Sequence, residues 1–255
     1  MSSNTNIIVL PFDSSSELLS YKLKRRISKI YFFSYDDIFR LKNDKSLQKV
    51  FSKNVLSIIL LSEHENELLQ HFFRSSKLVI NGNVVALITS NTGQPLNDKF
   101  LESYSDITFY CFRTNGNITK ATNIIFSFLN TIVFALHTFG FMDVTLADFI
   151  SLHKNTNIGF FSKYISRKQS LDVYRASKLV INNIEKINCA FLNKYSLLRG
   201  ILLFIVPSTI SISEIIQLTN KIIKKLNNID LKIGIYLRKG NLNCEIFLYL
   251  TASKK

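Results

Sequence analysis

One long and almost wholly apolar segment, Thr119–Thr138, lies near the middle of this 255-residue chain and limits what the chain can fold into. A helix that is apolar all round must be surrounded, either by protein or by lipid. The stretch Ile124–Met142 is also about the length that spans a bilayer. Polar residues interrupt it, namely Ser127, Asn130, Thr131, His137 and Thr138. They favour a central helix buried inside a folded protein, with a membrane span as the alternative.

Upstream of this helix, short apolar strands alternate with helical patterns. The predicted strands are Asn6–Phe12, Lys29–Tyr35, Val55–Leu61, Val84–Thr89 and Ile107–Phe112. Helices are predicted at Glu17–Arg26, after a capping cluster at Asp13–Ser16, and at Glu63–Arg74. This alternation predicts a parallel, Rossmann-like sheet with helices on its faces, over residues 1–118.

Downstream, the pattern changes to that of a second and smaller α/β unit. Helices are predicted at Leu146–Lys154 and Ser170–Ile187, and strands at Gly200–Val206, Lys232–Leu237 and Cys244–Thr251. Between the first two strands, Ser211 begins a helix that runs to Lys225, with Glu214 at the capping-box position. We expect three parts: residues 1–118, the central helix 119–142 and residues 143–255.

The chain is strongly basic, with 32 Lys and Arg against 18 Asp and Glu and a formal net charge of +14. Such a charge favours contact with nucleic acid, an anionic bilayer or an acidic protein. A solvated basic surface, or the codon bias of an AT-rich genome, would give the same composition. The basic residues that gather around the helix Ser170–Ile187 are candidates for a basic face: Arg167, Lys168, Arg175, Lys178 and Lys186.

The cysteines and histidines predict neither a disulfide framework nor a metal site. The three cysteines are far apart and lack metal-ligand spacing: Cys111, Cys189 and Cys244. The four histidines are scattered as well: His64, His71, His137 and His153. The N-terminus has no basic segment followed by a long apolar run, so no secretory signal is expected. We therefore expect a cytoplasmic protein.

Four pieces of the last quarter follow one another in the order and at the spacing of one known family. They are a strand with Arg-Gly at Leu198–Leu203, a helix start at Thr209–Ile215, a strand with a central glycine at Leu231–Tyr236 and a last strand at Cys244–Ala252. Together they resemble the second domain of FtsZ. Upstream, Phe139–Phe149 is similar to the FtsZ loop that follows the central helix. The resemblance implies a tubulin/FtsZ-like α/β fold.

The departures from the family concentrate in its GTP-binding loops, whose glycines let backbone amides approach phosphates. The first loop is reduced to Leu10–Ser16, with Asp13, Ser14 and Ser15. Where the family has its glycine-rich motif, Ser62–Leu68 has no glycine and carries Glu63, Glu65 and Glu67. None of the 8 glycines has a second glycine within four residues, so no shift of alignment restores the motif. We expect no nucleotide cofactor and no metal.

The family hydrolyses GTP in trans, through two acidic residues of the loop after the central helix. In this chain the first falls on Thr145 and the second on Asp148, with Asp143 nearby. Asp148 is either a carboxylate stabilised by the N-terminus of a helix or a remnant of catalysis. The resemblance therefore implies a pseudo-GTPase, in which Asp143, Thr145 and Asp148 are candidates for protein interaction.

The resemblance implies that this protein acts by association in cell division or filament assembly, with copies of itself or by capping or modulating a true FtsZ. FtsZ subunits join head to tail, and such contacts propagate into filaments. Two alternatives stay open. One is a basic scaffold that binds nucleic acid or an anionic membrane on a tubulin-like fold, and the other is a relic FtsZ that still assembles by itself.

Overall fold

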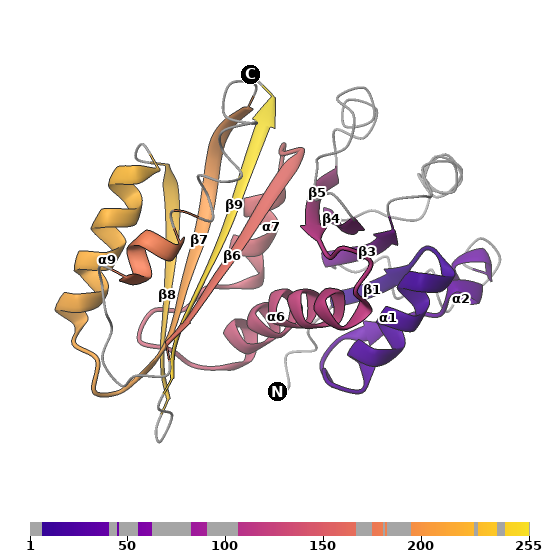
Figure 1. Ribbon diagram of the computed structural model, residues 1–255, viewed down its shortest axis with the longest axis horizontal. Helices are drawn as coiled ribbons and strands as arrows, with labels where there is room; N and C mark the ends of the chain where they lie inside the picture. The colour runs from indigo at the N-terminus through magenta and orange to yellow at the C-terminus, as the bar shows by residue number, and fades with distance from the viewer. Residues whose placement is uncertain are drawn as a thin grey trace. The chain divides into compact units, whose positions relative to one another are not determined.

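The computed structural model describes residues 7–40, 45, 56–62, 83–90, 107–166, 175–180, 182, 195–226, 229–238 and 243–254. The chain divides into two compact units, Met1–Val133 and Phe134–Lys255. The division falls within helix α6 (Ile118–His137), which is the predicted central helix (Figure 1). The predicted helix Glu63–Arg74 lies outside the described residues.

The first unit contains a parallel sheet with the strand order β2-β1-β3-β4-β5. Its strands are β1 (Ile7–Pro11), β2 (Tyr31–Phe32), β3 (Leu56–Ser62), β4 (Asn83–Ser90) and β5 (Ile107–Arg113). Runs of Ile, Val and Leu form these strands, and almost every described side chain of β1, β3 and β4 is buried. This is the composition of a parallel sheet covered on both faces. The predicted parallel sheet is confirmed.

One predicted strand of this sheet, Lys29–Tyr35, is much shorter in the structure. Only Tyr31–Phe32 pairs with β1, and helix α2 (Tyr35–Arg40) begins directly afterwards. The reason is a local cap, because the Ser34 N–H and Oγ–H both donate to Asp37 Oδ2, at 2.8 and 2.7 Å. Such a side-chain bond starts a helix and ends the extended chain.

The N-terminal part of α6 packs on β5 and on the turn that follows helix α1 (Ser14–Lys24). The Phe128 ring meets Tyr110 edge-on, with centroids 4.9 Å apart, and the Arg26 guanidinium lies 3.8 Å from the centre of the Phe126 ring. Asn117 caps the helix by accepting the Lys120 N–H at 2.9 Å. These contacts bury the apolar stripe of α6 that contains Ile125, Phe128 and Leu129.

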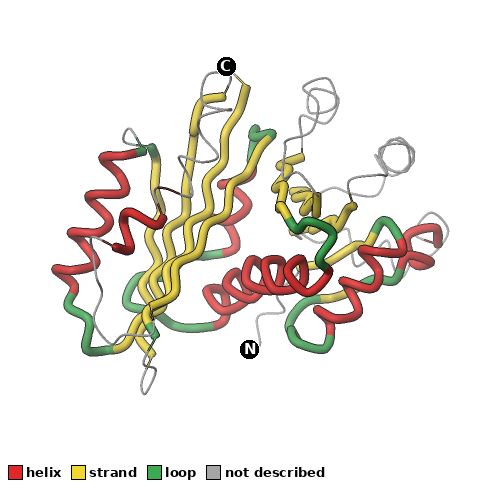
Figure 2. Tube along the Cα trace, in the orientation of Figure 1, coloured by secondary structure: helices red, strands yellow, loops and turns green. Residues whose placement is uncertain are grey.

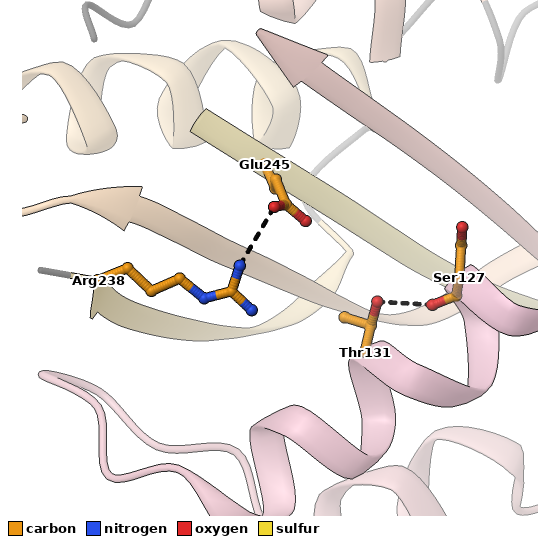
Figure 3. Close-up of polar contacts among 4 residues, drawn as sticks. All are labelled: Ser127, Thr131, Arg238 and Glu245. Carbon is orange, nitrogen blue, oxygen red and sulfur yellow. Dashed lines mark hydrogen bonds and ion pairs between the residues drawn. The ribbon is translucent and has the colours of Figure 1, made fainter. Parts of the chain in front are cut away.

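Three hydroxyl side chains of α6 find partners inside the helix itself. The hydroxyl groups of Thr122, Ser127 and Thr131 donate to the carbonyl oxygens four residues earlier, at 2.6 to 2.8 Å (Figure 3 draws Ser127 and Thr131). By length and composition α6 could cross a membrane, but half of its most apolar window is buried inside the protein. This burial agrees with the expected core helix.

The second unit contains a mixed sheet with the strand order β6-β9-β7-β8. Its strands are β6 (Ile158–Ser166), β7 (Tyr195–Pro207), β8 (Asp230–Arg238) and β9 (Cys244–Lys254). Strand β9 pairs antiparallel with β6 and β7, and β7 pairs parallel with β8. Helix α9 (Ile212–Lys225) connects the two parallel strands, which is the usual crossover of a parallel pair.

Two helices cover opposite faces of this second sheet (Figure 2). One face packs Leu202, Phe204 and alternate residues of β9 against α9 and the helical residues 175–180. The other face packs against helix α7 (Leu146–His153), where the Phe149 ring meets Tyr249 edge-on at 5.7 Å. The predicted cap of α9 is confirmed, because Ser211 and Glu214 form a complete capping box.

Strand β6 is missing from the sequence-based prediction, which is wrong for Ile158–Ser166. The segment mixes glycine, serine and lysine with aromatic residues, so it shows neither a clean alternation nor an apolar run. It becomes a strand by pairing along its whole length with Cys244–Ala252, nearly ninety residues later. Strand β7 likewise begins at Tyr195, before the predicted Gly200, through pairing with the end of β9.

His153, in the last turn of α7, makes the stability of the protein depend on pH. Its ring is buried, and Nδ1 lies 2.6 Å from the Phe149 carbonyl oxygen. Burial lowers the pKa of His153 from 6.5 to about 4. The folded state therefore favours neutral imidazole, so this contribution is complete above pH 6.5 and is lost as the pH falls towards 4.

We expect His153 to remove up to about 3 kcal/mol of the free energy of unfolding across this pH window. Chemical denaturation at several pH values checks this, with His153→Gln as the variant. The pH slope between 6.5 and 4 becomes shallower in His153→Gln. His137→Gln, which removes a partly buried histidine, is the matched control, and equal slopes in wild type and His153→Gln would contradict the assignment.

Candidate functional site

The first candidate site lies at the edge of the first unit's sheet where the carboxyl ends of the strands meet. The strand order places β2 on one side of β1 and β3, β4 and β5 on the other, so the direction in which strands are added reverses at β1. In open parallel sheets, ligands bind outside the carboxyl ends at such a switch point. The two loops in which the sequence departs from the FtsZ pattern follow β1 and β3. Just after β1, the Phe12 N–H donates to Leu60 O of β3 at 3.1 Å.

Asp13 is the N-cap of α1, as the capping cluster predicted, although the helix begins at Ser14 and not at Glu17. Its Oδ1 accepts the Ser16 N–H at 2.5 Å, and its backbone oxygen accepts the Glu17 N–H at 2.8 Å. Ser16 Oγ in turn accepts the N–H groups of Phe12 and Asp13, each at 2.9 Å. The carboxylate and hydroxyl thus close the turn on itself.

This closed turn has a chemical consequence for anions. The N-terminus of a helix attracts phosphate because its first N–H groups and the helix dipole are available to a ligand. Here the Phe12, Asp13 and Ser16 N–H groups all have partners inside the turn, and the buried carboxylate of Asp13 lies at the positive end of the helix. Of the other loop, the structure describes Ser62 only, and Glu63, Glu65 and Glu67 lie outside the described residues.

The second candidate site is the loop between α6 and α7, which β8 holds in place. The Phe141 N–H donates to Ile235 O at 2.7 Å, and the Ile235 N–H donates to Met142 O at 2.8 Å. Met142 and Ile235 therefore form a short antiparallel bridge. The Gly140 N–H donates to Asp143 Oδ1 at 2.7 Å, which closes the turn. The backbone bonds to Ile235 and this side-chain bond together fix the shape of the turn.

The same loop exposes large apolar side chains. Phe139 is 97% exposed, Phe141 60% and Met142 43%. We refer to these three residues as the apolar loop face. Single exposed apolar residues are ordinary, whereas several together on a fixed loop mark an interaction surface. Asp143 and Thr145, which the sequence singles out, are also exposed and lie beside this face in the chain.

Asp148 has a structural role at the start of α7. Its Oδ2 accepts the Thr145 N–H and the Thr145 Oγ–H, both at 2.8 Å, and its own N–H donates back to Thr145 Oγ1 at 3.3 Å. The two residues therefore form a reciprocal capping box. This geometry agrees with the first interpretation of Asp148, a carboxylate stabilised at a helix N-terminus.

Tyr236 is the residue of this site that sequence reasoning missed. It is fully buried on β8, donates its hydroxyl to Ala135 O at 3.2 Å and accepts the Val144 N–H at 3.1 Å. Burial raises the pKa of Tyr236. The hydrogen bond from the Val144 N–H lowers this pKa, and the charges of Asp143 and Asp148 raise it. One hydroxyl group thus joins the end of α6 to the end of the loop. The signal in the sequence was a tyrosine in a mostly apolar strand, because a buried tyrosine hydroxyl usually has a hydrogen-bond partner.

Arg238, the last residue of β8, supports the same end of α6. Its guanidinium lies 4.6 Å from the centre of the Phe134 ring and pairs with Glu245 of β9 at 3.3 Å (Figure 3). The Phe134 ring also meets Tyr236 edge-on at 5.5 Å. Tyr236 and Arg238, two residues apart on β8, therefore both contact Phe134 in the last turn of α6, and Glu245 of β9 pairs with Arg238.

The remaining candidates divide between exposed and undescribed positions. Arg175 and Lys178 of the predicted basic face are exposed, whereas Arg167, Lys168 and Lys186 lie outside the described residues. Within the described part of the chain, no three His, Cys, Asp or Glu side chains come together in a way that could hold a metal ion.

No protein-family model and no curated protein matches this sequence. Solved structures do match over nearly the whole chain. The empty FtsZ dimer of M. jannaschii gives a TM-score of 0.61 at 12% identity, covering 96% of this chain and 87% of that one. Bacillus thuringiensis TubZ, solved as GDP-form protofilaments, gives 0.66 at 10% identity and coverage of 99% and 86%.

CetZ from Methanosaeta thermophila is similar to the same extent, with a TM-score of 0.63 at 11% identity and coverage of 98% and 87%. These similarities agree with the parallel sheet, the long α6 and the mixed second sheet described above. The chain has an FtsZ/tubulin-like fold, as the resemblance of its sequence implied.

Proposed function

We propose that this chain is a cytoplasmic, non-hydrolysing FtsZ-like protein that acts by association in filament assembly or cell division. Its partner is a second copy of itself or a filament of an FtsZ-like protein, which it would join, cap or modulate. The fold supports this proposal, since the similar FtsZ was solved as a dimer and the similar TubZ as protofilaments.

The observation that carries the proposal is the apolar loop face. Phe139, Phe141 and Met142 stay exposed although the backbone between them is bonded to Ile235. Because the loop is already ordered, binding through it loses little conformational entropy. Phe and Met are among the residue types enriched at the buried centre of protein interfaces.

Association through this face would be heterologous in a head-to-tail assembly, in which the loop of one subunit meets a different surface of the next. Contacts of this kind grow into filaments when both surfaces are competent, and a subunit with only one competent surface ends the filament. Where the interface between subunits depends on bound nucleotide, the closed β1–α1 turn favours a subunit with only one competent surface, which ends the filament.

The first test replaces the exposed aromatic residues of the loop. Phe139→Ser with Phe141→Ser is expected to weaken association about a hundredfold, because each residue has the exposure of an interface anchor. Sedimentation velocity of the pure protein, and co-sedimentation with FtsZ filaments, measure the effect. The control is Ile212→Ser with Ile216→Ser, two exposed apolar residues of α9. Association that survives in the loop variant, or is absent in both assays of wild type, would refute the proposal.

The second test concerns the nucleotide. The closed turn at Asp13 and the threonine at position 145 support a protein that neither binds nor hydrolyses GTP. We expect calorimetry with GTP and Mg²⁺ to show no stoichiometric binding and phosphate release to stay at background. Tight binding, or turnover that disappears in Asp148→Ala, would show that the pseudo-GTPase assignment is wrong.

The alternative is a basic scaffold for nucleic acid or an anionic membrane. Its support is charge, since residues 134–255 hold seventeen Lys and Arg against seven Asp and Glu. Arg175 and Lys178 are exposed within that unit. A salt-sensitive gel shift with duplex DNA, together with no association in either sedimentation assay, would favour the scaffold.

A further inference from the structure

A second exposed surface lies on α1, in the first unit, far in sequence from the loop used above. Leu18, Tyr21 and Arg25 are spaced three and four residues apart, so they share one helix face, and Lys22 lies beside them. We call these four residues the α1 face. Leu18 is 49% exposed and Tyr21 54%, while the opposite side of the helix buries Leu19 and Leu23.

The α1 face combines these apolar tips with a dense positive charge. Five of the eight residues from Lys22 to Lys29 are basic, and no acidic residue occurs between Glu17 and Asp36. Arg25 is fixed against Tyr21, because its Nη2 donates to the tyrosine hydroxyl and its guanidinium carbon lies 4.5 Å from the ring centre. Arg26 is used elsewhere, since it bonds Asn123 and covers Phe126.

We propose that the α1 face is a docking surface for an anionic lipid bilayer. Charge complementarity selects an anionic partner, and the apolar tips decide which one. A phosphate polymer gains little from an exposed leucine on a convex helix. At a bilayer, Leu18 reaches the boundary of the acyl chains, the Tyr21 ring lies among the headgroups, and the Lys and Arg side chains contact lipid phosphates.

The expected binding is weak and sensitive to salt. Each basic residue close to an anionic leaflet strengthens binding about fivefold, and the effect falls off within a Debye length. Several basic residues together with two partly inserted side chains give reversible, peripheral binding to the bilayer and not a stable anchor. The surface works in a single subunit, so it does not require the association proposed above.

Vesicle flotation of the full chain tests this proposal, because flotation separates lipid-bound protein from any polymer. We expect the protein to float with vesicles that contain phosphatidylserine, not with pure phosphatidylcholine, and to be released by salt. Leu18→Ser with Tyr21→Ser is expected to weaken binding about tenfold without changing any charge. Arg25→Glu should weaken it to a similar degree.

Two controls distinguish binding through the α1 face from binding through any exposed aromatic residue or any exposed basic residue. Tyr31→Ser removes an equally exposed tyrosine outside α1, and Lys221→Glu reverses an exposed charge on α9. Both should change binding less than twofold, and circular dichroism verifies that each variant is folded. Flotation that does not depend on anionic lipid, or that is unchanged in Leu18→Ser with Tyr21→Ser, overturns the proposal. The proposal is also overturned if the protein binds duplex DNA through Arg25 and does not bind vesicles.

Discussion

Tyr236→Ala is expected to lower the free energy of unfolding by roughly 3–5 kcal/mol, the cost typical of emptying a large buried aromatic site. Tyr236 is fully buried between the end of α6 and the loop that follows it. Removing the ring leaves a cavity beside Phe134, and the Val144 N–H and Ala135 carbonyl lose their partner. Chemical denaturation, followed by circular dichroism, measures the change.

Tyr236→Phe separates the hydroxyl from the ring. It keeps the packing but leaves Val144 N–H and Ala135 O without that partner, which costs about 1–3 kcal/mol for a buried pair. Tyr164→Phe is the control, a buried tyrosine of β6 in the core against α9. If Tyr236→Phe is no less stable than Tyr164→Phe, the hydroxyl does not stabilise the loop.

Gly140→Ala is expected to detach the apolar loop face from β8 and to weaken association more than tenfold. A Cβ at this position would lie 2.5 Å from Ile235 O, 2.9 Å from Tyr236 Cδ1 and 3.0 Å from Asp143 Oδ1. The nearest of these is a backbone oxygen that already accepts the Phe141 N–H at 2.7 Å, so it has little freedom to move.

Two measurements on Gly140→Ala belong together. Denaturation should show a loss of about 1–3 kcal/mol from the overpacked turn, and sedimentation should show the loss of association. Ala147→Val is the matched control, because it adds bulk at an exposed position of the first turn of α7. A Gly140→Ala protein that matches the control in both assays would show that the bridge between Met142 and Ile235 is not needed.

The sequence predicted the parts of this fold that depend on neighbouring residues. The apolar runs of β1, β3, β4 and β5 give the parallel sheet, and Ser211 with Glu214 gives the start of α9. Asp13 was predicted as a helix cap for the same reason, since its partner Ser16 is three residues away. Helix caps and apolar runs can be predicted from sequence because the interacting groups are close along the chain.

The features that the sequence did not predict depend on distant partners. Strand β6 exists through its pairing with β9, and Tyr236 gains its role from Ala135 and Val144, which lie about a hundred residues earlier. The apolar loop face shows the same limit, because Phe139 and Phe141 are ordinary apolar residues until Ile235 fixes their backbone. The family resemblance located this loop but not its exposure.

The bridge that ties Met142 to Ile235 has a consequence for timing. Because the loop keeps one backbone conformation, it does not have to become ordered when two surfaces meet. If subunits associate as proposed, a loop that β8 and Tyr236 already hold would keep the same conformation before and after the contact forms. The lifetime of such a contact would be set by how fast the two surfaces separate.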